Sequence, residues 1–222
     1  MLRIALIAAL AIPSALAAES RSVEIESSDG WTLAGTLWQD DEGAPSVLLL
    51  HQCNADRSMY EELGGKLADA GFRVLAIDFR GFGESQGDVV RDSFPEDVEA
   101  AYQFLSEGDG DVFGALGASC GGSEVIKIAN AHPEIRRLGF LSAGLSAIDK
   151  RDAMQLTSQA MLFIAAKGDP RAAESAGTVV YRIRSRGKLL LYDGDAHGYP
   201  LFEQDPELIG KIVDWFSAGL DP

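Results

Sequence analysis

The prediction of the architecture starts from GALGASCGGSEV, Gly114 to Val125, which contains the pattern Gly-x-Ser-x-Gly between Gly117 and Gly121. The pattern follows an apolar, strand-like run and opens a segment with helical spacing of apolar residues. A chain that turns this sharply from strand to helix strains its central residue, and side chains two positions away would collide with neighbouring backbone. We therefore interpret Ser119 as a nucleophile displayed at the end of a buried strand.

The rest of the chain alternates strand-like and helix-like segments. Alternating polar and apolar residues around Asp29-Gly30 predict an antiparallel hairpin. Further apolar runs predict strands within 46–52, 72–79, 111–119, 135–144, 160–168 and 187–194. Helices are predicted over 58–71 and from near Pro95, Gly121, Asp152, Arg171 and Pro206. This alternation favours an α/β fold with a doubly wound, mostly parallel eight-stranded sheet, helices on both faces and no separate lid domain.

Residues 1–17 have the layout of a secretory signal peptide. Arg3 precedes an apolar run from Ile4 to Ile12, and small residues follow up to an Ala-x-Ala pattern at Ala17. The run is shorter than the roughly 20 residues that a membrane-spanning helix needs. We expect cleavage near Ala17, an exported protein that is periplasmic or secreted, and a single domain over 18–222. A retained N-terminal anchor is the alternative.

The chain is acidic, with 34 Asp and Glu against 19 Lys and Arg in 222 residues. A surface of this charge argues against nucleic acid or an anionic membrane as the main partner. The nucleotide-binding patterns G-x-G-x-x-G at the first strand and G-x-x-x-x-G-K-[ST] do not occur, and the cysteines and histidines lack metal-ligand spacing. We expect no cofactor, no metal and no integral membrane association after signal cleavage, and we leave the oligomeric state open.

A serine hydroxyl becomes a good nucleophile only when a base takes its proton, and the chain contains three histidines. His132 lies at the end of a predicted surface helix, where we expect a solvated imidazole. His51 ends a strand, and we expect it to orient the loop that follows. His197 follows the last strand in a glycine-flanked loop, from which an imidazole can reach the centre of the sheet edge. We therefore predict His197 as the base.

An acid that orients the histidine is expected after a strand between nucleophile and base. Asp169 directly follows an apolar strand and lies 28 residues before His197. Its carboxylate would hold the imidazole tautomer and stabilise the imidazolium. Three other carboxylates compete with it, because they too follow strands: Asp149, Asp193 and Asp195. The last two of these lie so close to the histidine in sequence that they would only brace its loop.

Together with LLLHQCN at 48–54 and DFRGFGES at 78–85, these residues resemble the α/β-hydrolase fold family. Among its members they are most similar to small, cap-less dienelactone-hydrolase-like serine esterases. The resemblance runs from Trp31 to Trp215. The dienelactone hydrolases proper have a cysteine at the position of Ser119, so their particular substrate is not implied.

The resemblance implies a serine hydrolase that cleaves small-molecule carboxylic esters. An acyl-enzyme would form on Ser119, with His197 as general base and acid and Asp169 orienting the imidazole. A peptidase or thioesterase of the same fold is an alternative, because one triad serves all of these reactions. A binding protein that kept the fold without turnover is a second alternative.

The family's oxyanion hole carries over onto two backbone N–H groups, those of Cys120 and Cys53. Many relatives have glycine where this chain has Gln52, whose side chain would add a polar contact or narrow the site. If both amides bind one oxygen, the two α-carbons can lie within the roughly 4.4 to 6.8 Å of a disulfide. A Cys53–Cys120 disulfide and two small buried thiols are both open at this point.

Cys120 is also a formal alternative nucleophile, because small residues lie two positions to either side of it. Glycine rather than alanine lies two positions before Ser119, and a lone activated thiolate oxidises readily outside the cytoplasm, so serine is favoured. The short loops predict an open pocket. Its candidate apolar walls are Phe82, Leu145, Tyr199 and Phe202.

Overall fold

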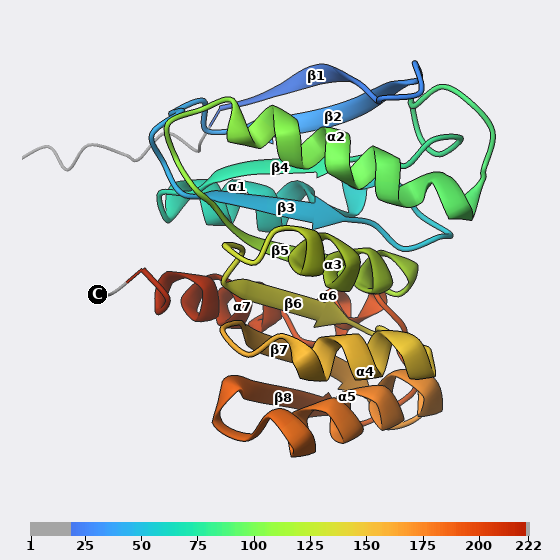
Figure 1. Cartoon of the computed structure of the whole chain (residues 1–222). Coiled ribbons are helices and arrows are strands. Elements are labelled where there is room, and N and C mark those ends of the chain that lie inside the picture. Colours follow the sequence, from blue (N-terminus) through green and yellow to red (C-terminus); the bar gives the residue numbers. More distant parts are fainter. Residues whose placement is uncertain (1–18, 221–222) are drawn as a thin grey trace, which may run out of the picture.

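The computed structural model describes residues 19–220, so the expected signal peptide at 1–17 lies outside the described residues. One sheet has the order β1-β2-β4-β3-β5-β6-β7-β8 (Figure 1). Its strands are β1 Ser20–Glu26, β2 Thr32–Trp38, β3 Ser46–Leu50, β4 Arg73–Ile77, β5 Val112–Ala118, β6 Arg137–Leu141, β7 Ala160–Ala166 and β8 Gly187–Tyr192. β2 pairs antiparallel with β1 and β4, and every other pair is parallel. The predicted eight-stranded, mostly parallel sheet is confirmed.

Helices cover both faces of this sheet (Figure 1). They are α1 Glu61–Asp69, α2 Phe94–Ser106, α3 Cys120–Ala131, α4 Ala147–Gln155, α5 Pro170–Ile183, α6 Pro200–Gln204 and α7 Leu208–Ser217. α2 to α5 contribute to one apolar cluster, and α1, α6 and α7 contribute to the other. Within residues 19–220, none of these helices combines the length and hydropathy that crossing a bilayer requires.

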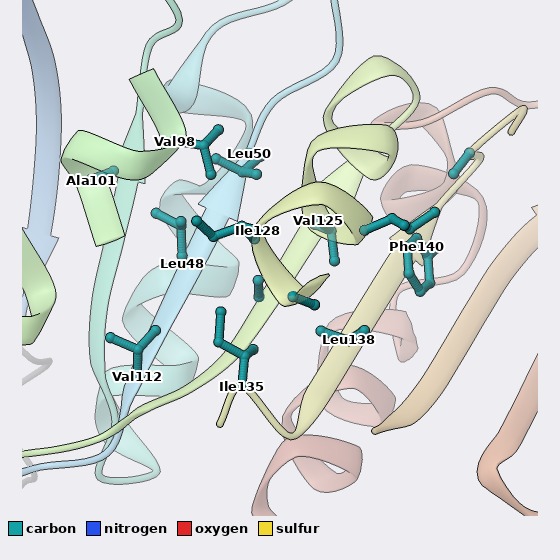
Figure 2. Close-up of a cluster of buried hydrophobic side chains, with 14 of the residues drawn as sticks. Leu48, Leu50, Val98, Ala101, Val112, Val125, Ile128, Ile135, Leu138 and Phe140 are labelled. Atoms are coloured by element: carbon teal, nitrogen blue, oxygen red, sulfur yellow. The ribbon is translucent and has the colours of Figure 1, made fainter. Parts of the chain in front are cut away.

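The parallel strands are buried on both faces, which is why they appear in the sequence as continuous apolar runs. In β3, Leu48 and Leu50 pack into the cluster under α2 and α3, whereas Val47 and Leu49 pack into the cluster on the opposite face. Figure 2 shows the first cluster, in which Val125 of α3 lies among these side chains. A fully buried leucine contributes roughly 2 kcal/mol. The two clusters therefore hold the carboxyl ends of the parallel strands along one rigid edge.

Two helical predictions need correction. The helix expected from near Asp152 begins at Ala147, because Ser146 and Asp149 form a reciprocal capping box. The short α6, which begins at Pro200 after the predicted base, was not expected, since five residues are too few to show helical periodicity. α4 is the only helix between β6 and β7, so this segment adds no lid domain.

Candidate active site

Ser119 occupies the tight turn between β5 and α3, with φ 49° and ψ −111°. Its N–H donates to the carbonyl of Leu141 at 2.8 Å, which helps to hold this strained backbone. A Cβ on Gly117 would lie 2.2 Å from the carbonyl oxygen of Gly121, and one on Gly121 would lie 2.5 Å from that of Leu50. Side chains are therefore excluded at both positions, as predicted from the sequence, and the serine is presented at the sheet edge.

Three predicted residues meet at the carboxyl ends of β5, β7 and β8. The hydroxyl Oγ of Ser119 lies 2.8 Å from Nε2 of His197, and Nδ1 of the same ring lies 2.6 Å from Oδ2 of Asp169. The other carboxylate oxygen, Oδ1, accepts from the N–H of Ala172 at 3.4 Å and so caps α5. The His197 side chain is 44% exposed. This arrangement lets the imidazole take the hydroxyl proton while the carboxylate holds its orientation.

The competing carboxylates have other partners. Asp149 accepts from Ser146 and Ser123 at the start of α4. Asp193 binds the ammonium of Lys167 at 2.6 Å. Asp195 is exposed in the loop that carries His197. The carboxylate that contacts the imidazole of the site is that of Asp169.

His51 is fully buried and links two loops at the sheet edge. Its Nδ1 lies 2.8 Å from the carbonyl of Gln52, and its Nε2 accepts from the N–H of Phe79 at 3.0 Å. Burial lowers the pKa of His51, which keeps the ring neutral near pH 7. Because Nε2 is the acceptor, Nδ1 carries the proton. The residue orients the loop after β3, as expected.

His132 differs from its prediction. Its ring stacks on Tyr102 with centroids 3.6 Å apart, and Nε2 lies 2.8 Å from a carboxylate oxygen of Glu99. Both partners come from α2, whereas His132 ends α3. The expected solvated imidazole is therefore wrong, because the ring forms a structural contact between two helices.

Cys53 and Cys120 form a disulfide with α-carbons 5.9 Å apart. Of the two alternatives that the sequence left open, the structure shows the disulfide and not two thiols. The bond also removes Cys120 as a rival nucleophile. Oxidising compartments preserve disulfides, which agrees with export, although export itself stays a prediction.

The disulfide joins the two segments that were expected to supply oxyanion donors. Cys120 is the first residue of α3, and the first N–H groups of a helix have no acceptor within it. The positive end of the helix dipole adds to the attraction for an anion there. Cys53 belongs to the loop that follows β3. The covalent link sets the separation of these two backbone segments.

A pocket of about 430 Å³ opens beside the hydroxyl of Ser119. Most of the residues that line it are polar or charged by type, among them Arg91, Lys127, Glu124 and Arg171. Burial raises the pKa of Glu124, one oxygen of which binds Lys127 at 2.7 Å. Polar and charged residues recur on one face of α3 at 123, 124 and 127, and this helical spacing is the signal in the sequence that indicates such a wall.

The predicted apolar walls are wrong, because none of the four side chains lines this pocket. Leu145 belongs to the core at 5% exposure. Phe82 packs edge-on against His51. Tyr199 and Phe202 lie at α6, and Tyr199 lines a different depression beside the loop after β3. The unexpected helix is what carries these two aromatic residues away from the pocket.

Comparison with curated proteins finds several matches, each of which covers only part of the chain. A protein of Mycobacterium tuberculosis described as uncharacterized is 34% identical over 119 residues, which cover 51% of this chain and 42% of that protein. A putative non-heme haloperoxidase of Mycobacterium phage D29 is 31% identical over 145 residues, which cover 65% of this chain and 50% of that protein. The chain thus spans about half the length of the curated relatives it matches.

Comparison with solved structures finds the same fold along nearly the whole chain. The esterase Pf2001 of Pyrococcus furiosus has a TM-score of 0.72 at 20% identity and covers 96% of this chain and 97% of its own. The carboxylesterase EstE1, cloned from a metagenomic library, has a TM-score of 0.72 at 16% identity and covers 93% and 91%. These likenesses show the α/β-hydrolase fold, and the dienelactone-hydrolase-like subtype stays a prediction.

A family model described as serine aminopeptidase, S33 matches residues 42–202. The matched region includes β3 to β8 and all three residues of the hydrogen-bonded trio. Since this is well over half of the sequence, the chain belongs to the serine aminopeptidase S33 family of α/β-hydrolases.

Proposed function

We propose that the protein is a serine hydrolase that cleaves small carboxylic esters through an acyl-enzyme on Ser119. The observation that carries the proposal is the unbroken hydrogen-bonded chain from Ser119 through His197 to Asp169, with contacts of 2.8 and 2.6 Å. Two solved structures with this fold are named an esterase and a carboxylesterase, which adds support.

The first half of the reaction forms the acyl-enzyme. Nε2 of His197 accepts the hydroxyl proton while Oγ of Ser119 bonds to the ester carbonyl carbon. The carboxylate of Asp169 accepts from the Nδ1–H of the resulting imidazolium and stabilises its charge. The imidazolium then gives the proton to the alkoxide oxygen as the carbon–oxygen bond breaks. An alcohol leaves, and the acyl group stays on the serine.

The second half uses water in place of the serine. Nε2 accepts a proton from the water as its oxygen attacks the acyl carbon, and the returning proton restores the hydroxyl of Ser119. A carboxylic acid leaves. In both halves the N–H groups of Cys120 and Cys53 would donate to the oxyanion, and one such donor is typically worth roughly 10² to 10³ in kcat.

The surroundings of the trio favour small, polar esters over long-chain lipids. The imidazole of His197 is 44% exposed, so substrates approach it directly from solvent. The pocket wall carries both signs of charge, including Arg91, Arg171 and Glu124. Such a wall offers charge and hydrogen bonds to the polar groups of a small ester.

The test is turnover of 4-nitrophenyl acetate by the purified protein, run beside Ser119→Ala. We expect wild type to turn over and to be labelled by a fluorophosphonate, and the variant to lose roughly 10⁴-fold or more in kcat/KM at unchanged melting temperature. The family description makes peptide hydrolysis the competing outcome, so an aminoacyl 4-nitroanilide is assayed in parallel. Turnover of the anilide alone would show that the substrates are peptides and not esters. If the protein shows no turnover of either substrate and no labelling, the alternative of a binding protein is favoured.

A further inference from the structure

The backbone that follows His197 is held by two side chains from other strands. The N–H of Gly198 donates to Oγ of Ser142 at 2.8 Å, and the N–H of Tyr199 donates to Oε1 of Gln52 at 2.9 Å. Ser142 directly follows β6, and Gln52 lies just beyond the end of β3. Two consecutive amides are thus anchored to two separate points of the sheet edge.

Both anchors are themselves buried and fixed. Ser142 is 0% exposed, and its N–H donates to the carbonyl of Ile164 on the neighbouring strand at 2.8 Å. Gln52 is 4% exposed, and its Nε2 donates to the side-chain oxygen of Asn54 at 2.7 Å. A buried polar side chain that is held by hydrogen bonds has few alternative rotamers. These acceptors therefore define where the loop must lie.

The loop meets Gln52 without any space between them. A Cβ built on Gly198 would lie 1.7 Å from Oε1 of Gln52, and this glycine has φ +68°. The position therefore requires glycine both for its backbone conformation and for the close approach of the amide. The residue directly after the imidazole is thus pressed against the segment that carries Cys53.

We propose that Gln52 and Ser142 are positioning residues that hold His197 within reach of Ser119 and Asp169. The proposal rests on the proposed function and adds two residues to it, neither of which touches the reacting atoms. Gln52 also precedes Cys53, so one side chain sets the base loop relative to an expected oxyanion donor. A glycine at this position would supply no such acceptor. Misplacing a catalytic group by about 1 Å can cost roughly 10²-fold in rate.

Gln52→Met keeps the length of the side chain and removes its acceptor. The matched control is Gln159→Met, because Gln159 is 2% exposed and likewise accepts one backbone N–H at 3.1 Å and donates to one carbonyl at 2.9 Å. We expect Gln52→Met to lower kcat for 4-nitrophenyl acetate by roughly ten- to a hundredfold, with a much smaller change in KM. The control should keep the wild-type kcat.

Ser142→Ala tests the second anchor in the same way. Its control is Ser175→Ala, since Ser175 is 1% exposed and accepts the N–H of Leu145 at 3.0 Å. We expect a loss of about tenfold in kcat for the first variant and wild-type kcat for the second. Because the two anchors hold adjacent amides, the double variant Gln52→Met/Ser142→Ala should lose less than the product of the single losses.

A spectroscopic measurement separates failure of this proposal from failure of the proposed function. The Nδ1–H of His197 in its short bond to Asp169 should give a low-field proton NMR signal, which is assigned by its loss in His197→Asn. We expect that signal to broaden or shift in Gln52→Met and Ser142→Ala and to stay in both controls. This result is independent of turnover. The proposal is overturned if both anchor variants keep the wild-type signal, or if the controls lose as much kcat as the anchor variants.

Discussion

Two regions at the same edge of the sheet carry polar and charged residues and use them in opposite ways. After β4, Asp78 and Arg80 are 0% and 3% exposed. After β5, β7 and β8, the trio around Ser119 includes an imidazole that is 44% exposed. A charge that is taken out of water must have all its hydrogen bonds made within the protein, whereas a catalytic group must leave room for substrate.

The bonding at the end of β4 shows how complete the burial is. The carboxylate of Asp78 accepts the backbone N–H groups of Arg57 at 2.7 Å and Glu84 at 2.9 Å. The guanidinium of Arg80 binds the carboxylates of Asp97 and Asp29. DFRGFGES therefore fixes the loops around β4, and it does so without contributing to the pocket beside the serine. The comparison predicts that substitutions in the trio change kcat. Substitutions in the network of Asp78 and Arg80 should instead change the free energy of unfolding.

Of the three substitutions that test this comparison, Asp169→Asn is expected to have the largest effect. Asparagine cannot hold the imidazole tautomer as the carboxylate does, so kcat for 4-nitrophenyl acetate should fall by roughly 10³- to 10⁴-fold. The melting temperature should barely change, because asparagine caps a helix as well as aspartate and α5 keeps its N-cap. Asp193→Asn and Asp149→Asn are the controls. A control that loses as much activity as Asp169→Asn would transfer the orienting role to that carboxylate.

The second largest effect is expected for removal of the disulfide, which links the start of α3, beside Ser119, to the loop after β3. Its two cysteines are 67 residues apart in sequence, so the double variant Cys53→Ala/Cys120→Ala should lose roughly 4 kcal/mol in free energy of unfolding. We also expect a lower kcat, because the expected oxyanion donors lose their covalent spacing. Urea unfolding of the variant and of reduced wild type should agree. An unchanged free energy of unfolding in both would show that packing alone sets this contact.

The smallest of the three effects is expected for Arg80→Met, which should lower the free energy of unfolding by about 3 kcal/mol at neutral pH, because it leaves Asp97 buried without its cation. The kcat of the folded variant should stay within about twofold of wild type, because this network lies outside the pocket. Urea unfolding and steady-state kinetics measure the two quantities. Arg21→Met, which breaks the exposed pair with Asp40, is the control and should cost less than about 0.5 kcal/mol.

The dependence of the free energy of unfolding on pH in the acid range gives a sharper test of that prediction. A hydrogen bond from Arg80 lowers the pKa of Asp29 from 3.8 to about 2. A carboxyl whose pKa is lowered by folding stabilises the fold above its unfolded value and loses that contribution as pH falls toward the folded value. Wild type should therefore lose this contribution between pH 3.8 and about 2, and Arg80→Met should lack most of that pH dependence. If the free energy of unfolding of Arg80→Met falls with pH in parallel with that of wild type over this range, Arg80 does not lower the pKa of Asp29.

Local patterns were enough to predict much of this protein. The glycines around Ser119 are required by contacts within one turn, and the strands of a doubly buried sheet are visible as apolar runs. The order of nucleophile, acid and base along the chain then placed Asp169 and His197 at the same edge, because parallel strands end together. Each of these inferences depends on short-range sterics or on strand direction, both of which a sequence carries directly.

Contacts between distant segments were out of reach of such patterns. The polar wall of the pocket, the place of Tyr199 on α6 and the anchoring of its N–H by Gln52 bring together residues up to 147 positions apart. The disulfide was open between two alternatives until the α-carbons were seen 5.9 Å apart. Which side chains meet across such separations depends on the packing of whole elements, because a shift of one helix start or one short turn redirects every side chain it carries.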